Sequence, residues 1–198
     1  MKHIIDKSFS FCYGHRVHNQ RLDTNFTESG DACLACRHLH GHEGLIKIFL
    51  EEIIIGKNVK DTGMVTDFKH LGWAKNFIDD TLDHKFIMDV QDPLFHSEFP
   101  LIENFSKHTT KMPEGFYLPD LTHIQIWLDS QEKLTDAQKS AIFEKYEGAI
   151  FVDFVPTSEN LAGWLGTIAA EKMKGIPNVR VAAVEYWETP KSHCRVEL

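Results

Sequence analysis

Two long segments with strand periodicity place the strongest constraint on how this chain folds. Between Ser8 and Val17, large apolar residues alternate with small or polar ones, which is typical of a strand with one buried face. A second segment, residues 45–55, is rich in β-branched residues and ends at the turn signal Gly56-Lys57-Asn58. Residues 18–39 join the two segments and allow them to lie antiparallel. The sequence therefore predicts a sheet built around this pair of strands.

Histidines stand where these two strands would meet. His40 and His42 flank Gly41, and residues two apart on a strand point to the same face of the sheet. His15 follows the aromatic row of the first strand. If the strands pair, three neutral imidazoles come together and leave a fourth position open, which is typical of a catalytic zinc ion. The spacing thus predicts that His15, His40 and His42 bind Zn²⁺.

Two cysteines ahead of the histidine pair allow another kind of site. Cys33 and Cys36, together with His40 and His42, would form a closed Cys2His2 zinc site of the structural class. That alternative leaves His15 without a role. A redox-active Cys-x-x-Cys motif is less favoured, because no βαβ pattern surrounds the two cysteines.

The composition narrows the classes of function. With 21 basic and 29 acidic residues, the net charge is -8, which argues against a general surface for nucleic acid or anionic membranes. No apolar run approaches the roughly 20 residues of a membrane span, and the first residues lack a signal-peptide core. Four cysteines in 198 residues do not make a disulfide scaffold. We therefore expect a soluble cytoplasmic protein.

Four further elements follow from capping and periodicity. A helix with Asp67 as its N-cap is predicted to reach residue 83, and a second is predicted from about residue 156 to residue 174. Strands are predicted at residues 179–187 and 193–198.

Residues 87–155 break this pattern and contain several X-Pro pairs. Within them, residues 122–129 alternate as a strand, Thr135 opens a helix through a capping box, and residues 149–155 resemble another strand. A stretch with so many aromatic residues would be unusual as a free linker. We expect it to pack on the body of the protein.

Five motifs occur in an order that resembles one enzyme family, the 6-pyruvoyltetrahydropterin synthases and 6-carboxytetrahydropterin synthases. The resemblance covers residues 1–86 and 156–198. The motifs are Cys-Arg-His-Leu-His-Gly-His at 36–42, Gly-Met-Val-Thr-Asp-Phe at 63–68, Leu-Asp-His at 82–84, Pro-Thr-Ser-Glu-Asn-Leu at 156–161 and Glu-Thr at 188–189.

The resemblance implies an α+β fold, the tunnelling fold or T-fold, in which two helices pack on one face of an antiparallel sheet. Subunits of this family associate through their sheets into barrel-like homo-oligomers, and the analogy implies a hexamer. Residues 87–155 depart from the pattern, so a β-α-β-like insertion is expected within a single domain of residues 1–198.

The resemblance also implies a role for individual residues. Cys36 matches the catalytic thiol, although Cys33 is a second candidate, and the spacing to His40 favours Cys36. The other assignments carried over are His15, His40 and His42 as zinc ligands, Asp83 and His84 as the catalytic pair that assists proton transfer, and Glu188, Thr157 and Glu159 as substrate-binding residues.

The activity that the resemblance implies is that of a zinc-dependent lyase cleaving carbon–oxygen and carbon–carbon bonds. Its substrate would be 7,8-dihydroneopterin triphosphate and its product 6-carboxytetrahydropterin, in queuosine and deazapurine biosynthesis. The spacing of Cys36 from the His-Gly-His motif resembles this carboxy-forming branch. Two alternatives stay open: the pyruvoyl-forming reaction on the same substrate, and a non-catalytic zinc- or pterin-binding protein of the same fold.

Overall fold

The computed structural model describes residues 1–22 and 34–198. They form two compact units. The first unit contains residues 1–13, 42–83 and 157–198, and the second contains residues 14–41 and 84–156. The expected insertion at 87–155 falls within the second unit. That the whole chain acts as one domain stays a prediction.

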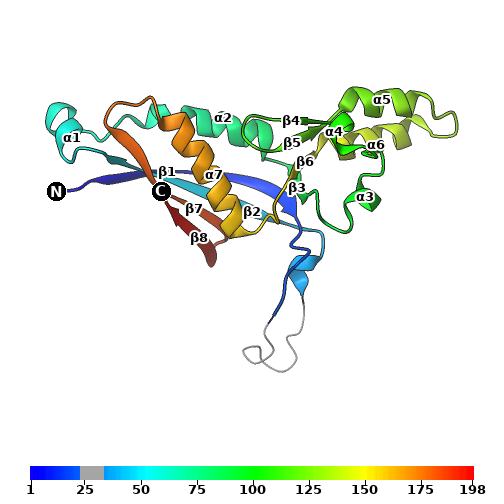
Figure 1. Cartoon of the computed structure of the whole chain (residues 1–198), viewed down its shortest axis with the longest axis horizontal. Helices are drawn as coiled ribbons and strands as arrows, with labels where there is room; N and C mark the ends of the chain where they lie inside the picture. The colour runs from blue at the N-terminus through cyan, green and yellow to red at the C-terminus, as the bar shows by residue number, and fades with distance from the viewer. Residues whose placement is uncertain (23–33) are drawn as a thin grey trace. The chain divides into compact units, whose positions relative to one another are not determined.

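The predicted long strands are present in a larger sheet. Strands β1 (Ile4–His15), β2 (His40–Glu52), β7 (Val179–Thr189) and β8 (Ser192–Glu197) are neighbours in that order (Figure 1). Strand β2 pairs antiparallel with β7, with Ile46 opposite Tyr186, and β7 pairs antiparallel with β8. The strands predicted at 179–187 and 193–198 are therefore confirmed.

The end of β2 differs from the prediction. The strand stops at Glu52, and the short helix α1 (Lys57–Thr62) replaces the expected simple turn. The Glu52 carboxylate accepts hydrogen bonds from the backbone N–H groups of Gly56, Asn58 and Val59, at 2.8, 2.5 and 3.1 Å. These bonds satisfy N–H groups that a helix start leaves without partners, so Glu52 stabilises a helical turn here.

Two longer helices cover one face of the first unit's sheet. The 3-10 turn η2 (Phe68–Leu71) leads into α2 (Gly72–Thr81), and α7 spans Ser158–Met173. Asp67 caps the first by accepting from the Lys69 backbone N–H at 2.8 Å, as predicted. Side chains of both helices meet those of β2 around one small cavity, lined by Ile46, Ile48, Trp73, Ala74, Phe77, Ile78, Leu165 and Ile168. The expected arrangement of two helices on one sheet face is thus confirmed.

The second unit is built from shorter elements. Four strands follow the order β4 (Thr109–Lys111), β5 (Tyr117–Pro119), β6 (Ala149–Val152), β3 (Lys85–Asp89), and β3 is followed by β1 in the full eight-stranded sheet. Strands β3 and β6 are parallel, so the sheet is mixed rather than purely antiparallel. A parallel pair needs a long crossover connection, and the residues between β3 and β6 supply it. The remaining elements are η1 (Ala35–Arg37), α3 (Phe95–Glu98), α4 (Phe105–His108), α5 (Leu121–Asp129) and α6 (Asp136–Glu147).

The prediction of a strand at residues 122–129 is wrong, because these residues form helix α5. The Asp120 carboxylate accepts from the backbone N–H groups of Thr122 and His123, which fixes a helix start. Ile124 and Leu128 lie four residues apart and are both buried on the same side of this helix. The helix opened by Thr135 is confirmed as α6, with its complete capping box.

Aromatic side chains form the core of the second unit. Phe151 of β6 is fully buried, and its ring centroid lies 5.0 Å from that of Phe95 and 4.9 Å from that of Phe99. The Phe99 ring also meets Tyr146 of α6 edge-on at 5.5 Å. Contacts of this geometry link elements that are each too short to be stable alone.

Candidate metal centre

The predicted zinc ligands extend the buried rows of β1 and β2. Phe9, Phe11 and Tyr13 alternate along β1 as core residues, and His15 is next in the row, with 0% of its surface exposed. Along β2, His40 and His42 have the same parity as the buried residues from Gly44 to Leu50. Strand alternation alone therefore turns these histidines to the buried face.

Gly44 makes room for an aromatic ring beside His42. A Cβ atom at this position would lie 3.1 Å from Phe11 Cζ and 3.1 Å from Tyr13 Cε1. The Tyr13 ring in turn packs against the His42 ring, with centroids 6.0 Å apart. The absence of a side chain at Gly44 thus lets the aromatic row of β1 approach β2 next to the histidines.

Main-chain carbonyls fix the tautomers of two histidines in the second unit. His15 Nδ1 lies 2.7 Å from the Pro156 carbonyl oxygen, and His40 Nδ1 lies 2.8 Å from the His38 carbonyl oxygen. A carbonyl oxygen only accepts, so each Nδ1 must carry the proton and donate it. Each neutral ring then keeps its lone pair on Nε2, the form in which histidine binds metals. The two rings lie 4.5 Å apart between centroids.

In the first unit, His42 is paired with Glu188 of β7. His42 Nε2 lies 3.1 Å from Glu188 Oε1, and the Ser158 hydroxyl donates to Glu188 Oε2 at 2.6 Å. Ser158 is the first residue of α7, so the helix start holds the carboxylate in place. Glu188, which the resemblance assigns to substrate binding, therefore also contacts a predicted metal ligand.

The donor atoms suit a metal ion. His15, His40, His42 and Glu188 each offer one ligand atom, and these atoms all lie within 4.8 Å of one another. Three imidazoles and a carboxylate form a donor set that zinc accepts, and the Nδ1 contacts of His15 and His40 are those that orient zinc ligands. Within residues 1–22 and 34–198, this is the group of side chains that could hold a metal.

Two buried tyrosines next to this group were missed by the sequence analysis. Burial raises the pKa of Tyr13, a hydrogen bond from Tyr186 lowers it in part, and the Glu188 charge raises it further. Burial also raises the pKa of Tyr186, followed by the effect of Tyr13. Both phenols therefore stay protonated at neutral pH, so they offer hydroxyl groups rather than negative charge.

Cys36 lies in the η1 turn as a half-buried free thiol. Its backbone N–H donates to Gln20 Oε1 at 3.1 Å, and its carbonyl oxygen accepts from the Val17 N–H at 2.7 Å. The backbone of the candidate thiol is therefore tied to the segment that follows His15. Cys36 is not one of the clustered metal donors. Cys33, the other candidate thiol and a ligand in the Cys2His2 alternative, lies outside the described residues.

Asp83 and His84 make other contacts in the described structure. Asp83 Oδ1 accepts a hydrogen bond from the Cys12 backbone N–H at 2.8 Å. His84 is exposed and has a backbone φ of 58°, in the left-handed region that few residues other than glycine adopt. Neither residue belongs to the four-residue group. Their predicted catalytic role stays a prediction.

The two other residues assigned to substrate lie at the start of α7. The Thr157 hydroxyl accepts from the Asn160 backbone N–H at 3.3 Å and caps the helix. Glu159 is exposed in the first turn. Thr157 therefore supports the helix that carries Ser158, the partner of Glu188.

The charge of Glu159 acts on a nearby cysteine. Burial raises the pKa of the Cys194 thiol, and the charge of Glu159 raises it further.

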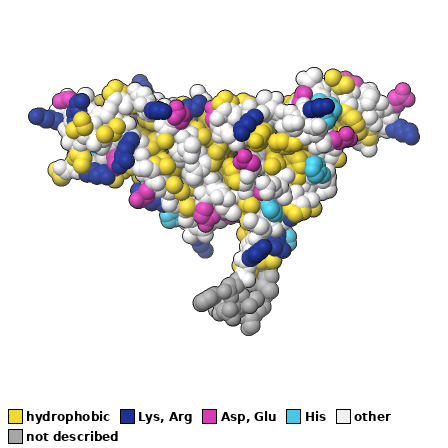
Figure 2. All heavy atoms as spheres, in the orientation of Figure 1, with side chains coloured by type: hydrophobic (Ala, Val, Ile, Leu, Met, Phe, Trp, Pro, Cys, Tyr) yellow, Lys and Arg dark blue, Asp and Glu magenta, His cyan; other side chains and the backbone are white. Residues whose placement is uncertain are grey.

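The described surface agrees with the composition. On the face that Figure 2 shows, lysine and arginine side chains are interspersed with acidic ones. In the described part of the chain, no helix combines the length and apolar character that crossing a bilayer requires.

Comparisons with known proteins give one consistent family. A model of the 6-pyruvoyl tetrahydropterin synthase family matches residues 4–198. A protein of Aquifex aeolicus (strain VF5) named 6-carboxy-5,6,7,8-tetrahydropterin synthase is 26% identical over 200 residues, which cover 97% of this chain and 96% of that protein.

Two solved structures are also similar. An uncharacterized protein from Wolinella succinogenes is 41% identical with a TM-score of 0.84, and the match covers 100% of this chain and 98% of that one. The 6-pyruvoyl tetrahydropterin synthase of Caenorhabditis elegans is 20% identical with a TM-score of 0.49, covering 100% and 96% of the two chains. The Wolinella match includes both units, so the second unit is also part of that protein.

Proposed function

The chain belongs to the 6-pyruvoyl tetrahydropterin synthase family and has its T-fold, and from this premise we propose that it is a zinc-dependent 6-carboxytetrahydropterin synthase. Its substrate would be 7,8-dihydroneopterin triphosphate, in queuosine and deazapurine biosynthesis. The observation that carries the proposal is the pair of histidines whose Nδ1 atoms donate to main-chain carbonyls, next to His42 and Glu188. The name of the Aquifex relative supports the carboxy-forming reaction.

The proposed cofactor is Zn²⁺ held by His15, His40 and His42. When bound, zinc would act as a Lewis acid that stabilises negative charge developing on the hydroxyl-bearing side chain of the substrate. The family assigns the pterin ring to Glu188. A carboxylate held by Ser158 at 2.6 Å is oriented to accept hydrogen bonds from ring N–H groups. Thr157 and Glu159 would complete the substrate contacts at the start of α7.

Proton transfer would use two further groups. Cys36 would act as the base that removes a carbon-bound proton from the substrate side chain. His84, with Asp83, would return a proton to the side chain. Release of triphosphate, followed by release of acetaldehyde with the uptake of one water molecule, would then leave the carboxy product. We also propose that the enzyme works in the cytoplasm as a homo-oligomer, with the hexamer of the family as its assembly.

The decisive experiment identifies the products. Protein loaded with zinc is incubated with dihydroneopterin triphosphate, and the mixture is analysed by mass spectrometry and an acetaldehyde assay. We expect 6-carboxytetrahydropterin, triphosphate and acetaldehyde. A pyruvoyl product without acetaldehyde would establish the pyruvoyl-forming alternative. Bound zinc and bound pterin without turnover would establish a binding protein.

Two cysteine variants test the assignment of the base. Cys36→Ala should keep zinc and pterin binding but lose turnover by about 10²- to 10⁴-fold, the usual contribution of a positioned general base. Cys33→Ala should remain active. The zinc content of His15→Ala separates the two models of the metal site. The variant should lose zinc if the three histidines hold the ion. It should keep zinc if the ion is held by the Cys2His2 set, which does not include His15. If activity depends on Cys33 and not on Cys36, the spacing argument is wrong.

A further inference from the structure

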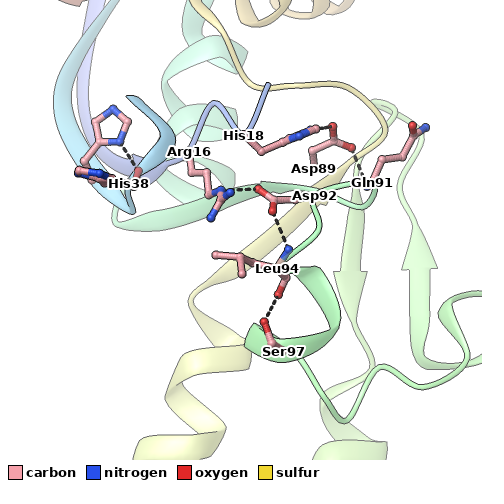
Figure 3. Close-up of polar contacts among 9 residues, drawn as sticks. Arg16, His18, His38, Asp89, Gln91, Asp92, Leu94 and Ser97 are labelled. Carbon is pink, nitrogen blue, oxygen red and sulfur yellow. Dashed lines mark hydrogen bonds and ion pairs between the residues drawn. The ribbon is translucent and has the colours of Figure 1, made fainter. Parts of the chain in front are cut away.

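Two buried aspartates of the second unit contact the segment that directly follows His15. Asp92 Oδ2 lies 2.8 Å from Arg16 Nε, and Asp92 Oδ1 accepts from the Leu94 backbone N–H at 2.8 Å (Figure 3). Only 1% of the Asp92 side chain is exposed, against 14% for Arg16. The Arg16 guanidinium is therefore held by a carboxylate that has almost no contact with solvent.

Asp89 makes the second contact to the same segment. Its Oδ2 accepts from His18 Nε2 at 3.0 Å, and its Oδ1 accepts from the Gln91 backbone N–H at 2.9 Å (Figure 3). Asp89 is the last residue of β3, and the Val90 N–H that follows donates to the Val152 carbonyl of β6 at 2.9 Å. The carboxylate is thus mounted on the paired strands of the second unit.

Stability alone does not account for these two buried contacts, the Arg16–Asp92 ion pair and the His18–Asp89 hydrogen bond. Removing a carboxylate from water is unfavourable, and a buried pair often adds nothing net to the free energy of unfolding. Both aspartates nevertheless converge on residues 16–18, at the point where the chain leaves His15. The same segment holds Cys36 through the bond from the Val17 N–H to the Cys36 carbonyl at 2.7 Å.

His15 itself is held from the other end of the insertion. Pro156, whose carbonyl accepts from His15 Nδ1 at 2.7 Å, follows β6, whereas Asp89 and Asp92 stand at the end of β3 and shortly after it. Residues near the start of the insertion and the residue directly after its end therefore both contact residues 15–18. All of these contacts lie within the second unit.

We propose that Asp89 and Asp92 are positioning residues, which hold the Arg16–His18 segment so that His15 and Cys36 are set for metal binding and catalysis. This inference rests on the proposed function. It also gives the insertion a role, because its ends brace the segment between a predicted ligand and the candidate thiol.

The test compares zinc affinity with stability. In Asp92→Asn the amide oxygen can still accept from the Leu94 N–H, but the charge that holds Arg16 is gone. Zinc affinity, measured by competition with a chromogenic chelator, should fall about 10- to 100-fold, as for other groups that orient metal ligands. Asp89→Asn should act in the same direction. Arg16→Lys, which keeps the positive charge, should retain more zinc affinity than Arg16→Met.

Two control variants exclude a merely structural effect. Glu98→Gln removes the Lys145–Glu98 ion pair, 2.9 Å long and partly exposed in the same unit, and should leave zinc affinity unchanged. Phe99→Leu loosens the aromatic core, so the zinc-free protein should melt earlier while zinc affinity is kept. The inference is overturned if Asp92→Asn binds zinc like the wild type, or if Phe99→Leu loses as much affinity. Wild-type protein that takes up no zinc would overturn the proposed function, and this inference with it.

Discussion

The two units reach a buried core by different means. In the first unit, β1, β2 and β7 each contribute a row of alternating side chains, and α2 and α7 cover that face. In the second unit, strands of three to five residues are joined by rings from separate elements. A periodic core is specified locally by each strand, whereas an aromatic cluster exists only once distant segments have met.

The polar contacts differ in the same way. The first unit pairs its buried Glu51 with Lys2 and Arg180, whose side chains are 48% and 54% exposed. The second unit buries Asp89 and Asp92 against partners that are themselves mostly covered. The cations that pair with Glu51 therefore stay near water, whereas Arg16 and its partner Asp92 are both largely covered.

The largest effect should come from the aromatic cluster. Phe151→Ala removes the ring that meets Phe95 and Phe99, and a buried Phe→Ala substitution lowers the free energy of unfolding by about 3–5 kcal/mol. Hydrogen exchange followed by mass spectrometry should show protection lost in the second unit and kept in β7 and β8. Equal loss in both units would show that they unfold as one, and the contrast between them would fail.

A smaller effect is expected from a glycine in the first unit. In Gly44→Ala the new methyl group would lie 3.1 Å from Phe11 and from Tyr13, and such overpacking lowers the free energy of unfolding by about 1–3 kcal/mol. Gly163→Ala in α7 is the matched control, because its Cβ would meet no atom within 4 Å. That change should stabilise the helix by about 0.5–1 kcal/mol. Equal shifts of the urea unfolding midpoint in Gly44→Ala and Gly163→Ala would contradict the close approach of Phe11 and Tyr13 to Gly44.

The smallest effect concerns acid stability. Lys2 lowers the pKa of Glu51 by hydrogen bonding, burial raises it, and Arg180 lowers it further, so the net direction is down. A carboxyl group with a lowered pKa in the folded state stabilises the protein at neutral pH and loses that contribution as the pH falls through the folded-state value. Glu51→Gln should therefore lower the Tm at pH 7, and this difference from the wild type should shrink as the pH falls below the ordinary glutamate pKa. Because both cations are exposed, the change should stay below about 1 kcal/mol. A Tm loss that does not shrink as the pH falls would show that packing, rather than charge, is responsible.

The elements that could be predicted are those that neighbouring residues encode. The long strands, the helix capped by Asp67 and the capping box of Thr135 were all predicted, since each is encoded by neighbouring residues. Residues 122–129 were misassigned because Ile124, Ile126 and Leu128 alternate as in a strand. Ile126 is in fact 65% exposed, and the Asp120 cap sets the helix. Strand β6 (Ala149–Val152) confirms the strand predicted within residues 149–155. Strand β3 was missed, because it has only five residues and depends on its parallel pairing with β6.

The part of the site that strand alternation determines was predictable. Alternation put His40 and His42 on one face and His15 next in the aromatic row of its strand. In the structure His15 is buried, and His40 and His42 are half-buried. The contact of Glu188 with His42 could not be derived, because it depends on the register of β2 against β7. Asp89 and Asp92 were missed because an acidic residue in an irregular stretch is normally exposed.

The carbonyls that orient His15 and His40 have a consequence for mutagenesis. The acceptors belong to the main chain at Pro156 and His38, and every amino acid carries the same oxygen. Alanine scanning would therefore pass over both positions without touching the hydrogen bonds that matter. A substitution at Pro156 or His38 would leave a carbonyl oxygen at that position, so a comparison of sequences would not reveal these hydrogen bonds. Replacing the amide after either carbonyl by an ester, which weakens the oxygen as an acceptor, would expose it.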